Sequence, residues 1–318
     1  MRYLGLCCSF VALSLSVLGQ GRSVAITVDD LPYADGGAPA AANTSEAASL
    51  VRIANRRLLE ALQAHYAPVT GFVIQKTVES LGPEAGPGIL KEWTKRGFDL
   101  GNHTYSHPDI NDLSVEQIEK EIVRGEIAIG PLMKESGKKL AYFRFPFNHT
   151  GDNKEKHDTV AAFLSQRGYR SATCTIDNSD YLFNAAYVRM LARNDGESAK
   201  RLRAEYLAYT STEIDYYAAL NRQVLGYEPP QVMLLHDNRL NADVIEQVLQ
   251  LFAGRQYRFV SLDTAQADAA YQTPETFMTK FGPMWGYRWA NERNVKVNGS
   301  SEPDPPNWIL QYSKASAQ

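Results

Sequence analysis

Ionisable side chains stand at five places where an apolar run of the sequence ends. The first is a pair of carboxylates, Asp29 and Asp30, directly after the run Val24–Val28. Parallel α/β folds place their active sites at the carboxyl ends of strands. Adjacent residues on an extended strand point to opposite sides, but at a bend one carboxylate can bind a metal while the other faces a substrate. The alternative is an aspartate pair that caps the turn before Pro32.

Two histidines, His103 and His107, follow a second apolar run, Phe98–Gly101. Histidines four residues apart can converge on one metal ion if the loop makes a helical turn, and imidazole and carboxylate ligands suit a borderline metal such as Zn²⁺. A structural role is the alternative at this spacing. The position favours a metal site, because the chain has six histidines and two of them stand together at the end of one predicted strand.

The other three strand ends carry an arginine, two aspartates and a histidine. Arg144 is suited to a bidentate contact with a carboxylate, or it faces solvent. Asp177 and Asp180 stand together at the next strand end, and His236 at the last can act as a general acid near neutral pH. Any one of these groups could belong to a turn. Five charged strand ends together favour a site, because turns more often use glycine or asparagine.

Short apolar runs alternate with longer helical patterns along the chain, which is typical of a parallel α/β fold. Several runs are apolar throughout, as expected for strands that are covered on both faces. The predicted strands are Val24–Val28, Val69–Ile74, Phe98–Gly101, Ala141–Phe145, Ser171–Ile176, Val232–Leu235 and Phe259–Leu262. Seven strand-then-helix units suggest a barrel rather than an open sheet.

Three of the intervening helices have clear sequence signals. Apolar side chains repeat at helical spacing over Ala47–Ala64. Ser114 and Gln117 predict a capping box that opens a helix. Asn241 is expected to cap a helix over Ala242–Phe252.

Three segments are set apart from the predicted barrel at residues 22–270. Residues 1–21 have a positive start, an apolar stretch and small residues after it, which predicts a signal peptide and a secreted or periplasmic protein. A tyrosine-rich segment at about 184–226 breaks the strand–helix rhythm, and we expect an inserted helical cap that roofs the groove and narrows the substrate range. Residues 271–318 are expected to wrap the barrel as a C-terminal extension.

Composition excludes several classes of protein. The net charge is −3 over 318 residues, so no nucleic-acid or anionic-membrane partner is expected. Beyond residues 1–21 no apolar run is long enough to span a membrane, so no stable membrane anchor is expected. Without that segment Cys174 is the one remaining cysteine, which excludes a disulfide scaffold and a cysteine-based zinc site. The sequence does not reveal an oligomeric state.

The motifs at these strand ends resemble those of the polysaccharide deacetylases with the NodB homology domain, also called carbohydrate esterase family 4. The resemblance covers roughly residues 24–262, and each motif is weak alone while the ordered set is strong. The motifs are Thr27-Val-Asp-Asp30, His103-Thr-Tyr-Ser-His107, Arg144-Phe-Pro-Phe147, Asp177-Asn-Ser-Asp180-Tyr181 and Leu234-Leu-His236. The resemblance implies a distorted, TIM-like (β/α) barrel of seven or eight strands, here with a helical insertion.

The resemblance also implies an acid–base pair. Asp29 would be the general base, with Arg144 paired to it. His236 would be the general acid, with Asp180 tuning it. A carboxylate takes the proton of an attacking water, and a second titratable group protonates the amine, which is otherwise a poor leaving group.

A divalent metal and a set of substrate contacts complete what the resemblance implies. The metal ligands would be Asp30, His103 and His107. The metal is expected to be Zn²⁺, with Co²⁺ or Ni²⁺ as alternatives. The amide of Phe147 would help to hold the oxyanion, and Tyr181 and Leu234 would contact the substrate. Phe147 stands where the family usually has tyrosine, which keeps the amide, and Tyr181 stands where it has tryptophan, which alters an aromatic wall.

The implied function is hydrolysis of a carbon–nitrogen bond other than a peptide bond. N-deacetylation of an acetylated amino sugar in a polysaccharide or oligosaccharide is the leading interpretation. A hydrolase of another amide, such as a cyclic amide or ureide, is an alternative that family analogy does not separate from it. A non-catalytic glycan-binding homologue is a third, which is disfavoured because a degenerate copy would be expected to lose at least one of the site residues.

Overall fold

The structure, a computed structural model, describes residues 21–34 and 45–314. The predicted signal peptide lies outside this range except for Gly21. The strands are β1 (Ser23–Leu31), β2 (Val69–Val73), β3 (Asp99–Asn102), β4 (Tyr142–Phe143), β5 (Arg170–Ser171), β6 (Gln231–His236) and β7 (Arg258–Phe259). The helices are α1 (Ser45–Ala64), α2 (Gln75–Ser80), α3 (Ala85–Lys95), α4 (Val115–Gly125), α5 (Ile129–Glu135), α6 (Lys154–Gln166), α7 (Asp180–Ala192), α8 (Gly196–Leu225), α9 (Arg239–Gly254), α10 (Leu262–Gln266), α11 (Trp285–Glu292) and α12 (Asn307–Lys314).

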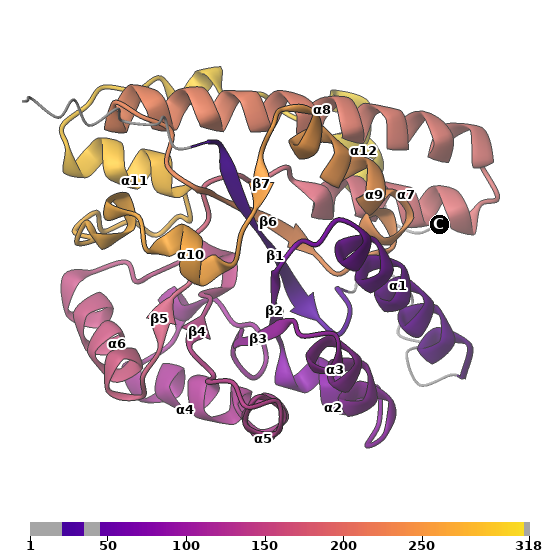
Figure 1. Cartoon of the computed structure of the whole chain (residues 1–318), viewed down its shortest axis with the longest axis horizontal. Coiled ribbons are helices and arrows are strands. Elements are labelled where there is room, and N and C mark those ends of the chain that lie inside the picture. The colour runs from indigo at the N-terminus through magenta and orange to yellow at the C-terminus, as the bar shows by residue number, and fades with distance from the viewer. Residues whose placement is uncertain (1–20, 35–44, 315–318) are drawn as a thin grey trace, which may run out of the picture.

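A parallel sheet runs through the centre of the molecule (Figure 1). Its strand order is β5-β4-β3-β2-β1-β6, and β7 pairs with the start of β1. The central strand β1 is buried along almost its whole length, which explains why Val24–Val28 is apolar on both faces. Six strands that all run in one direction bring their carboxyl ends to the same edge.

The two edges of this sheet meet through the chain that follows β5. The strand β5 itself pairs with β4, and further along Ile176 forms an isolated parallel bridge to Met233 of β6. The N–H of Leu234 donates to the carbonyl of Ile176 at 3.0 Å. The strands therefore curl into a distorted barrel that is closed by one bridge, as the sequence predicted.

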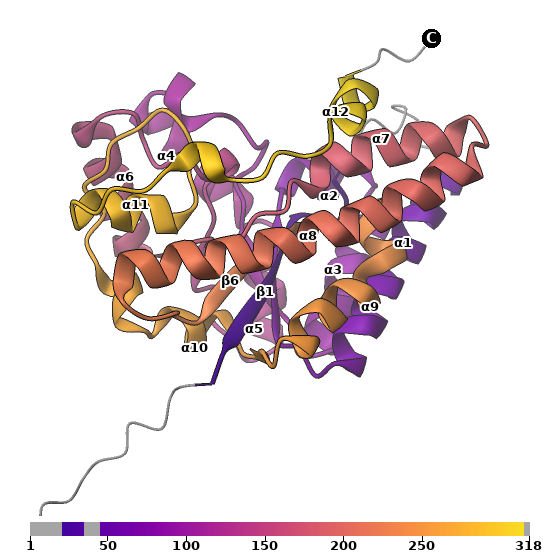
Figure 2. The ribbon, with the colours of Figure 1, turned by 90° about the horizontal axis from the view of Figure 1, so that it is seen from above.

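Helices cover the outside of the curled sheet, and α1 packs on α9 (Figures 1 and 2). The helices α1 to α3 pack together beside the first strands, and α4 packs on α6. The helices α7, α8 and α9 contact one another, while α11 packs on α8 and α12 on α7. Among the described helices, none is long and apolar enough to cross a membrane.

Every predicted strand is present, and three of them are much shorter than expected. The capping box of Ser114 and Gln117 opens α4 as predicted, and β4 and β5 are shorter than expected. The last strand was expected at Phe259–Leu262, but it ends at Phe259. Ser261 accepts a hydrogen bond from the N–H of Thr264 at 3.1 Å, so the chain has already turned into α10 at Leu262.

The segment 184–226 forms most of a hairpin of two helices, α7 and α8. Its tyrosines Tyr187, Tyr206 and Tyr217 are buried against neighbouring helices, which makes them part of the core. The helices α11 and α12 of the C-terminal extension lie against the same hairpin (Figure 2). Packing between these helices therefore joins the middle of the chain to its C-terminal part.

Candidate active site

Strand register places Asp29 and His236 side by side. The two residues are Cα partners in the parallel ladder between β1 and β6. Side chains of paired residues on adjacent strands point to the same face of a sheet. A long stretch of chain separates them in sequence, yet the hydrogen-bond ladder alone brings them to one face.

The backbone departs from the extended strand conformation at Asp30. Its φ is 64°, in the left-handed region, and the pairing of β1 with β2 shifts register at this point. The side chain therefore does not point away from that of Asp29, as it would on an extended strand. Instead its Oδ1 lies 3.5 Å from Nε2 of His103 and 3.6 Å from Nε2 of His107.

The two histidines converge through a loop that is not a helical turn. Thr104 and His107 both have left-handed φ angles, of 72° and 57°. The N–H of His107 donates to Oγ1 of Thr104 at 3.0 Å, and the first amides of α2 donate to the loop carbonyls of Thr104 and Tyr105. The imidazole rings of His103 and His107 lie 4.8 Å apart, centre to centre.

The ligand atoms of Asp30, His103 and His107 all lie within 4.8 Å of one another. Nδ1 of His103 donates to the carbonyl of Arg144 at 2.8 Å, which leaves the lone pair of Nε2 facing the group. Burial lowers the pKa of both histidines, that of His103 well below its usual range, so both rings are neutral. Oδ1 of Asp30 is buried without a hydrogen-bond partner among the described residues. These residues fit a divalent metal, which needs neutral imidazoles and would satisfy the orphaned oxygen.

Asp29 and Arg144 form a buried ion pair beside this group. Nη1 of Arg144 lies 3.3 Å from Oδ2 of Asp29, and Nη2 donates to Oγ1 of Thr27 at 3.0 Å, so the contact is single rather than bidentate. Burial raises the pKa of Asp29 to about 6, although the guanidinium acts against this rise. Oδ1 of Asp29 has no partner within the described part of the chain. At neutral pH the carboxyl is mostly ionised, with one oxygen free.

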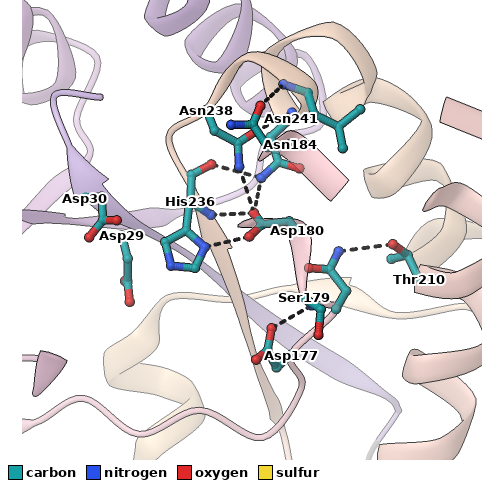
Figure 3. Close-up of polar contacts among 12 residues, drawn as sticks. Asp29, Asp30, Asp177, Ser179, Asp180, Asn184, Thr210, His236, Asn238 and Asn241 are labelled. Atoms are coloured by element: carbon teal, nitrogen blue, oxygen red, sulfur yellow. Dashed lines mark hydrogen bonds and ion pairs between the residues drawn. The ribbon is translucent and has the colours of Figure 1, made fainter. Parts of the chain in front are cut away.

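His236 lies between the two strand-end carboxylates on one side and Asp180 on the other (Figure 3). Nδ1 of His236 is 2.6 Å from Oδ1 of Asp180, and its backbone N–H donates to Oδ2 at 2.7 Å. Burial acts to lower the pKa of His236, but the charge and hydrogen bond of Asp180 outweigh it, and the pKa rises to about 10. The ring is therefore protonated at neutral pH. Because Nδ1 is engaged with Asp180, Nε2 is the nitrogen left to give a proton.

Asp180 is fully buried and is held by the start of α9 (Figure 3). The side-chain amides of Asn238 and Asn241 both donate to its Oδ2, and Asn241 also donates to the carbonyl of His236 at 2.9 Å. The prediction that Asn241 caps this helix is wrong. Asn238 is the cap, because α9 begins at Arg239. The Asn241 side chain instead fixes the carboxylate behind His236.

One cavity of about 540 Å³ collects these groups, a volume that suits a small organic ligand. Its lining consists of Asp29, Asp30, His103, His107, Phe145, Phe147, Asn148, Asp177, Tyr181, Leu234, His236, Gly282 and Met284. Arg144 and Asp180 lie behind Asp29 and His236, and every other predicted site residue lines the cavity. The segment 184–226 contributes no residue to this described lining, so it does not roof the cavity as expected.

Two exposed aromatic rings border the cavity. Phe147, 54% exposed, stands edge-on to His107 with the ring centres 4.7 Å apart. Tyr181, 53% exposed, stands edge-on to His236 at 6.1 Å. Exposed rings beside a polar pocket offer faces on which a sugar ring can pack.

Gly282 and Met284 are lining residues that the sequence did not reveal. They belong to an irregular stretch before α11, where neither periodicity nor a motif marks them. Asn148 was missed as well, although it directly follows the predicted Phe147. For Asn148 the available signal was its place directly after a motif residue. No sequence signal marked Gly282 or Met284.

Residues 18–171 match the family model described as polysaccharide deacetylase. The chain is 23% identical over 219 residues to an uncharacterised 30.6 kDa protein of Geobacillus stearothermophilus, which covers 69% of this chain and 68% of that protein. It is 26% identical over 108 residues to a peptidoglycan-N-acetylglucosamine deacetylase of Bacillus cereus, which covers 34% of this chain and 36% of that protein. The resemblance to the polysaccharide deacetylases that the motifs predicted is therefore confirmed over residues 18–171, which are just under half of the chain.

The fold is shared with solved structures of carbohydrate esterase family 4. A mutant, with restored enzymatic activity, of a pseudoenzyme of that family aligns with a TM-score of 0.50 and 16% identity, over 77% of this chain and 68% of that chain. At this identity the likeness concerns the fold alone. Because the unmutated protein is described as a pseudoenzyme, the fold does not decide whether a member is active, and the site residues must be considered by themselves.

Proposed function

We propose that the protein is a metal-dependent deacetylase that removes the acetyl group from an acetylated amino sugar of a polysaccharide or oligosaccharide. The observation that carries this proposal is the close approach of Asp30, His103 and His107 in the same cavity as Asp29 and His236. A metal-ligand group, a base and an acid are the parts that hydrolysis of an amide needs. The match of residues 18–171 to the polysaccharide deacetylase model supports the same reaction class.

The metal would be held by Asp30, His103 and His107. Two imidazole nitrogens and one carboxylate oxygen suit Zn²⁺, with Co²⁺ and Ni²⁺ as alternatives. When bound, such an ion would supply Lewis-acid polarisation of the acyl carbonyl and of the attacking water. The hydrogen bond from Nδ1 of His103 to the carbonyl of Arg144 would keep the ring in the orientation that binding requires.

Asp29 would act as the general base. Its free Oδ1 accepts the proton of the water that attacks the acyl carbon. Arg144 holds the other oxygen and keeps the carboxyl ionised despite its burial. A pKa of about 6 is close enough to neutrality for the carboxylate both to be present and to accept a proton.

The backbone N–H of Phe147 would donate to the oxygen that becomes negative when the water attacks. Among the described backbone contacts this N–H has no acceptor. An N–H whose position is set in advance stabilises that charge without reorganisation. The replacement of tyrosine by Phe147 leaves the donor in place.

His236 would protonate the amine as the carbon–nitrogen bond breaks. Its pKa of about 10 keeps it charged over the neutral range, and Asp180 fixes its Nδ1 so that Nε2 delivers the proton. The products are acetate and a free amino sugar. Asp29 and His236 would then exchange protons with solvent to restore the starting state.

The substrate class is proposed from the cavity and the relatives. Phe147 and Tyr181 would flank one sugar ring, and Leu234 would contact its acetyl group. Relatives named as peptidoglycan-N-acetylglucosamine deacetylase and chitin deacetylase support an acetylated amino-sugar polymer. Such polymers lie outside the cytoplasm, which agrees with the export proposed from residues 1–21.

Acetate release from a panel of chitin oligosaccharides and peptidoglycan fragments tests the proposal. The protein is stripped of metal, reloaded with Zn²⁺, Co²⁺ or Ni²⁺ and assayed in each state, with ring opening of cyclic amides and ureides followed in parallel. We expect metal-dependent acetate release. Ring opening without acetate release would favour the other amide hydrolase, and glycan binding without any turnover would favour the non-catalytic homologue.

A further inference from the structure

The turn that carries the Phe147 amide has an unusual backbone. Phe147 and Asn148 have φ angles of 57° and 55°, two consecutive left-handed residues that are not glycine. Each such residue costs free energy, and the conformation persists only where its surroundings enforce it. The turn follows β4 directly, and two residues that line the cavity belong to it. What enforces the conformation lies far away in sequence.

Arg288 of α11 holds this turn from behind. It is 1% exposed, and its guanidinium donates from Nη2 to the carbonyl of Asn148 at 2.7 Å and from Nη1 to Oγ1 of Thr150 at 3.0 Å. Its Nε donates to the carbonyl of Pro283 at 3.1 Å, and its charge is balanced by Glu275. One buried side chain therefore ties the turn to the stretch before α11. A planar group with several donors is needed to reach three acceptors at once.

Gly282 lies against the carbonyl of Phe147 in the same turn. A Cβ at this position would stand 1.8 Å from the carbonyl oxygen of Phe147 and 3.0 Å from Cβ of Asn148. The contact is with backbone, which cannot move aside without moving the turn. Gly282 also lines the cavity, so the stretch forms one wall of the site. The N–H of Trp285 donates to the carbonyl of Cys174 at 3.0 Å, which anchors the end of this wall to the barrel.

We propose that Gly282 and Arg288 are positioning residues, which clamp the Phe147–Asn148 turn so that the Phe147 amide faces the reacting acyl oxygen. The proposal rests on the proposed deacetylase function for the role of that amide. Both residues lie beyond the segment 18–171 that matches the family model. The C-terminal extension is thereby part of the active site as well as a covering of the barrel.

The substitution Gly282→Ala tests the clamp most directly, because it adds one methyl group against the Phe147 carbonyl. We expect kcat for acetate release to fall by roughly 10- to 100-fold, with little change in KM, since the amide acts on charge that develops in the transition state. Metal content should match that of the control Gly130→Ala, where a Cβ meets nothing within 4 Å. A raised KM at constant kcat would overturn the proposal, because the methyl group would then merely obstruct the substrate.

The substitution Arg288→Lys tests the second residue. Lysine keeps the charge beside Glu275 but cannot reach Asn148, Thr150 and Pro283 together. We expect kcat to fall several-fold while metal affinity stays unchanged. Arg167→Lys is the matched control, because Arg167 makes a two-nitrogen contact with Glu126 at the surface. Loss of metal and of activity in equal measure would assign Arg288 a general structural role instead.

A readout that does not need activity separates this proposal from the proposed function. Hydrogen exchange of peptides covering residues 145–149 should be faster in Gly282→Ala than in the wild type and in Gly130→Ala. Wild-type protein that hydrolyses no acetylated sugar would defeat the deacetylase proposal, while faster exchange would still support the clamp. Unchanged exchange together with kcat within about twofold of the wild type would overturn the clamp itself.

Discussion

The two halves of the chain build one cavity in different ways. The half that matches the family model supplies the candidate metal ligands, Arg144 and Phe147 from the end of β1 and from short loops that directly follow strands. The other half supplies His236 at a strand end, and Asp180 of α7 and Asn241 of α9 hold that residue in place. The first half therefore depends on local motifs, and the second on packing between helices.

This difference indicates which substitutions should remove activity while the protein still folds. Neither half holds both of the proposed proton-transfer groups, because Asp29 belongs to β1 and His236 to β6. A change in the first half should remove the metal, whereas a change in the second should leave a metal-loaded but slow protein. The following substitutions test that division, starting with the largest effect.

His103→Ala should abolish acetate release and metal binding together, because it removes one of three ligands and leaves Asp30 and His107 too few to hold the ion. Elemental analysis of the purified protein, together with the acetate assay, measures both. His65→Ala is the matched control, since His65 pairs with Glu246 away from the site. Stoichiometric metal in His103→Ala would contradict this prediction, because metal binding would then not depend on the ligands of the first half.

His236→Ala should reduce kcat by about 10²- to 10⁴-fold while the metal content remains that of the wild type, because a general acid is lost and no proposed ligand is touched. Steady-state kinetics and elemental analysis of the same preparation are the measurements. If metal were lost along with activity, the acid and the metal group would not be separable between the halves.

Asp180→Asn should shift the alkaline limb of the pH profile to lower pH. The acid works only while protonated, so activity falls as pH rises through the pKa of His236, about 10. Since the Asp180 charge raises that pKa, its removal should lower the limb by about 1–3 units, while asparagine still offers an oxygen to the backbone N–H. The profile of kcat/KM against pH measures the shift. A limb that stays in place would show that another group provides the proton.

Tyr181→Trp should have the smallest effect. The residue is half exposed at the border of the cavity, so a larger ring alters contacts with the sugar and leaves the acid and the metal group unchanged. We expect kcat/KM to change by less than about tenfold, and by different factors for chitin oligosaccharides and peptidoglycan fragments. Equal factors on all substrates would remove Tyr181 from substrate selection.

The part of the site that was predictable rests on residues close together in sequence. Strands such as Val24–Val28 are apolar runs because both faces are buried, and a charge at the end of such a run is conspicuous. The convergence of His103 with His107 was predicted from their spacing and their place at one strand end. The backbone that achieves it did not, because nothing in the residue types of Asp30 or Thr104 announces a left-handed φ.

The part that was not predictable depends on contacts between distant segments. Asn241 had the residue type of a helix cap, and only the position of Asp180 in space gives its side chain another use. The segment 184–226 was expected over the cavity, but none of its residues belongs to the described lining. Gly282 is one glycine among 22, and its meaning appears only beside the Phe147 carbonyl.

The register of β1 on β6 has a consequence for how the family can diversify. Because Asp29 and His236 are ladder partners, the spacing of two hydrogen-bonded strands sets the distance between the Cα atoms of the proposed base and acid. Loops and helices between them can lengthen, shorten or be exchanged without altering that distance, provided that the two strands keep their pairing. Apart from Asp180, which holds the His236 side chain, chain inserted between these strands can therefore change while the spacing of Asp29 and His236 stays fixed.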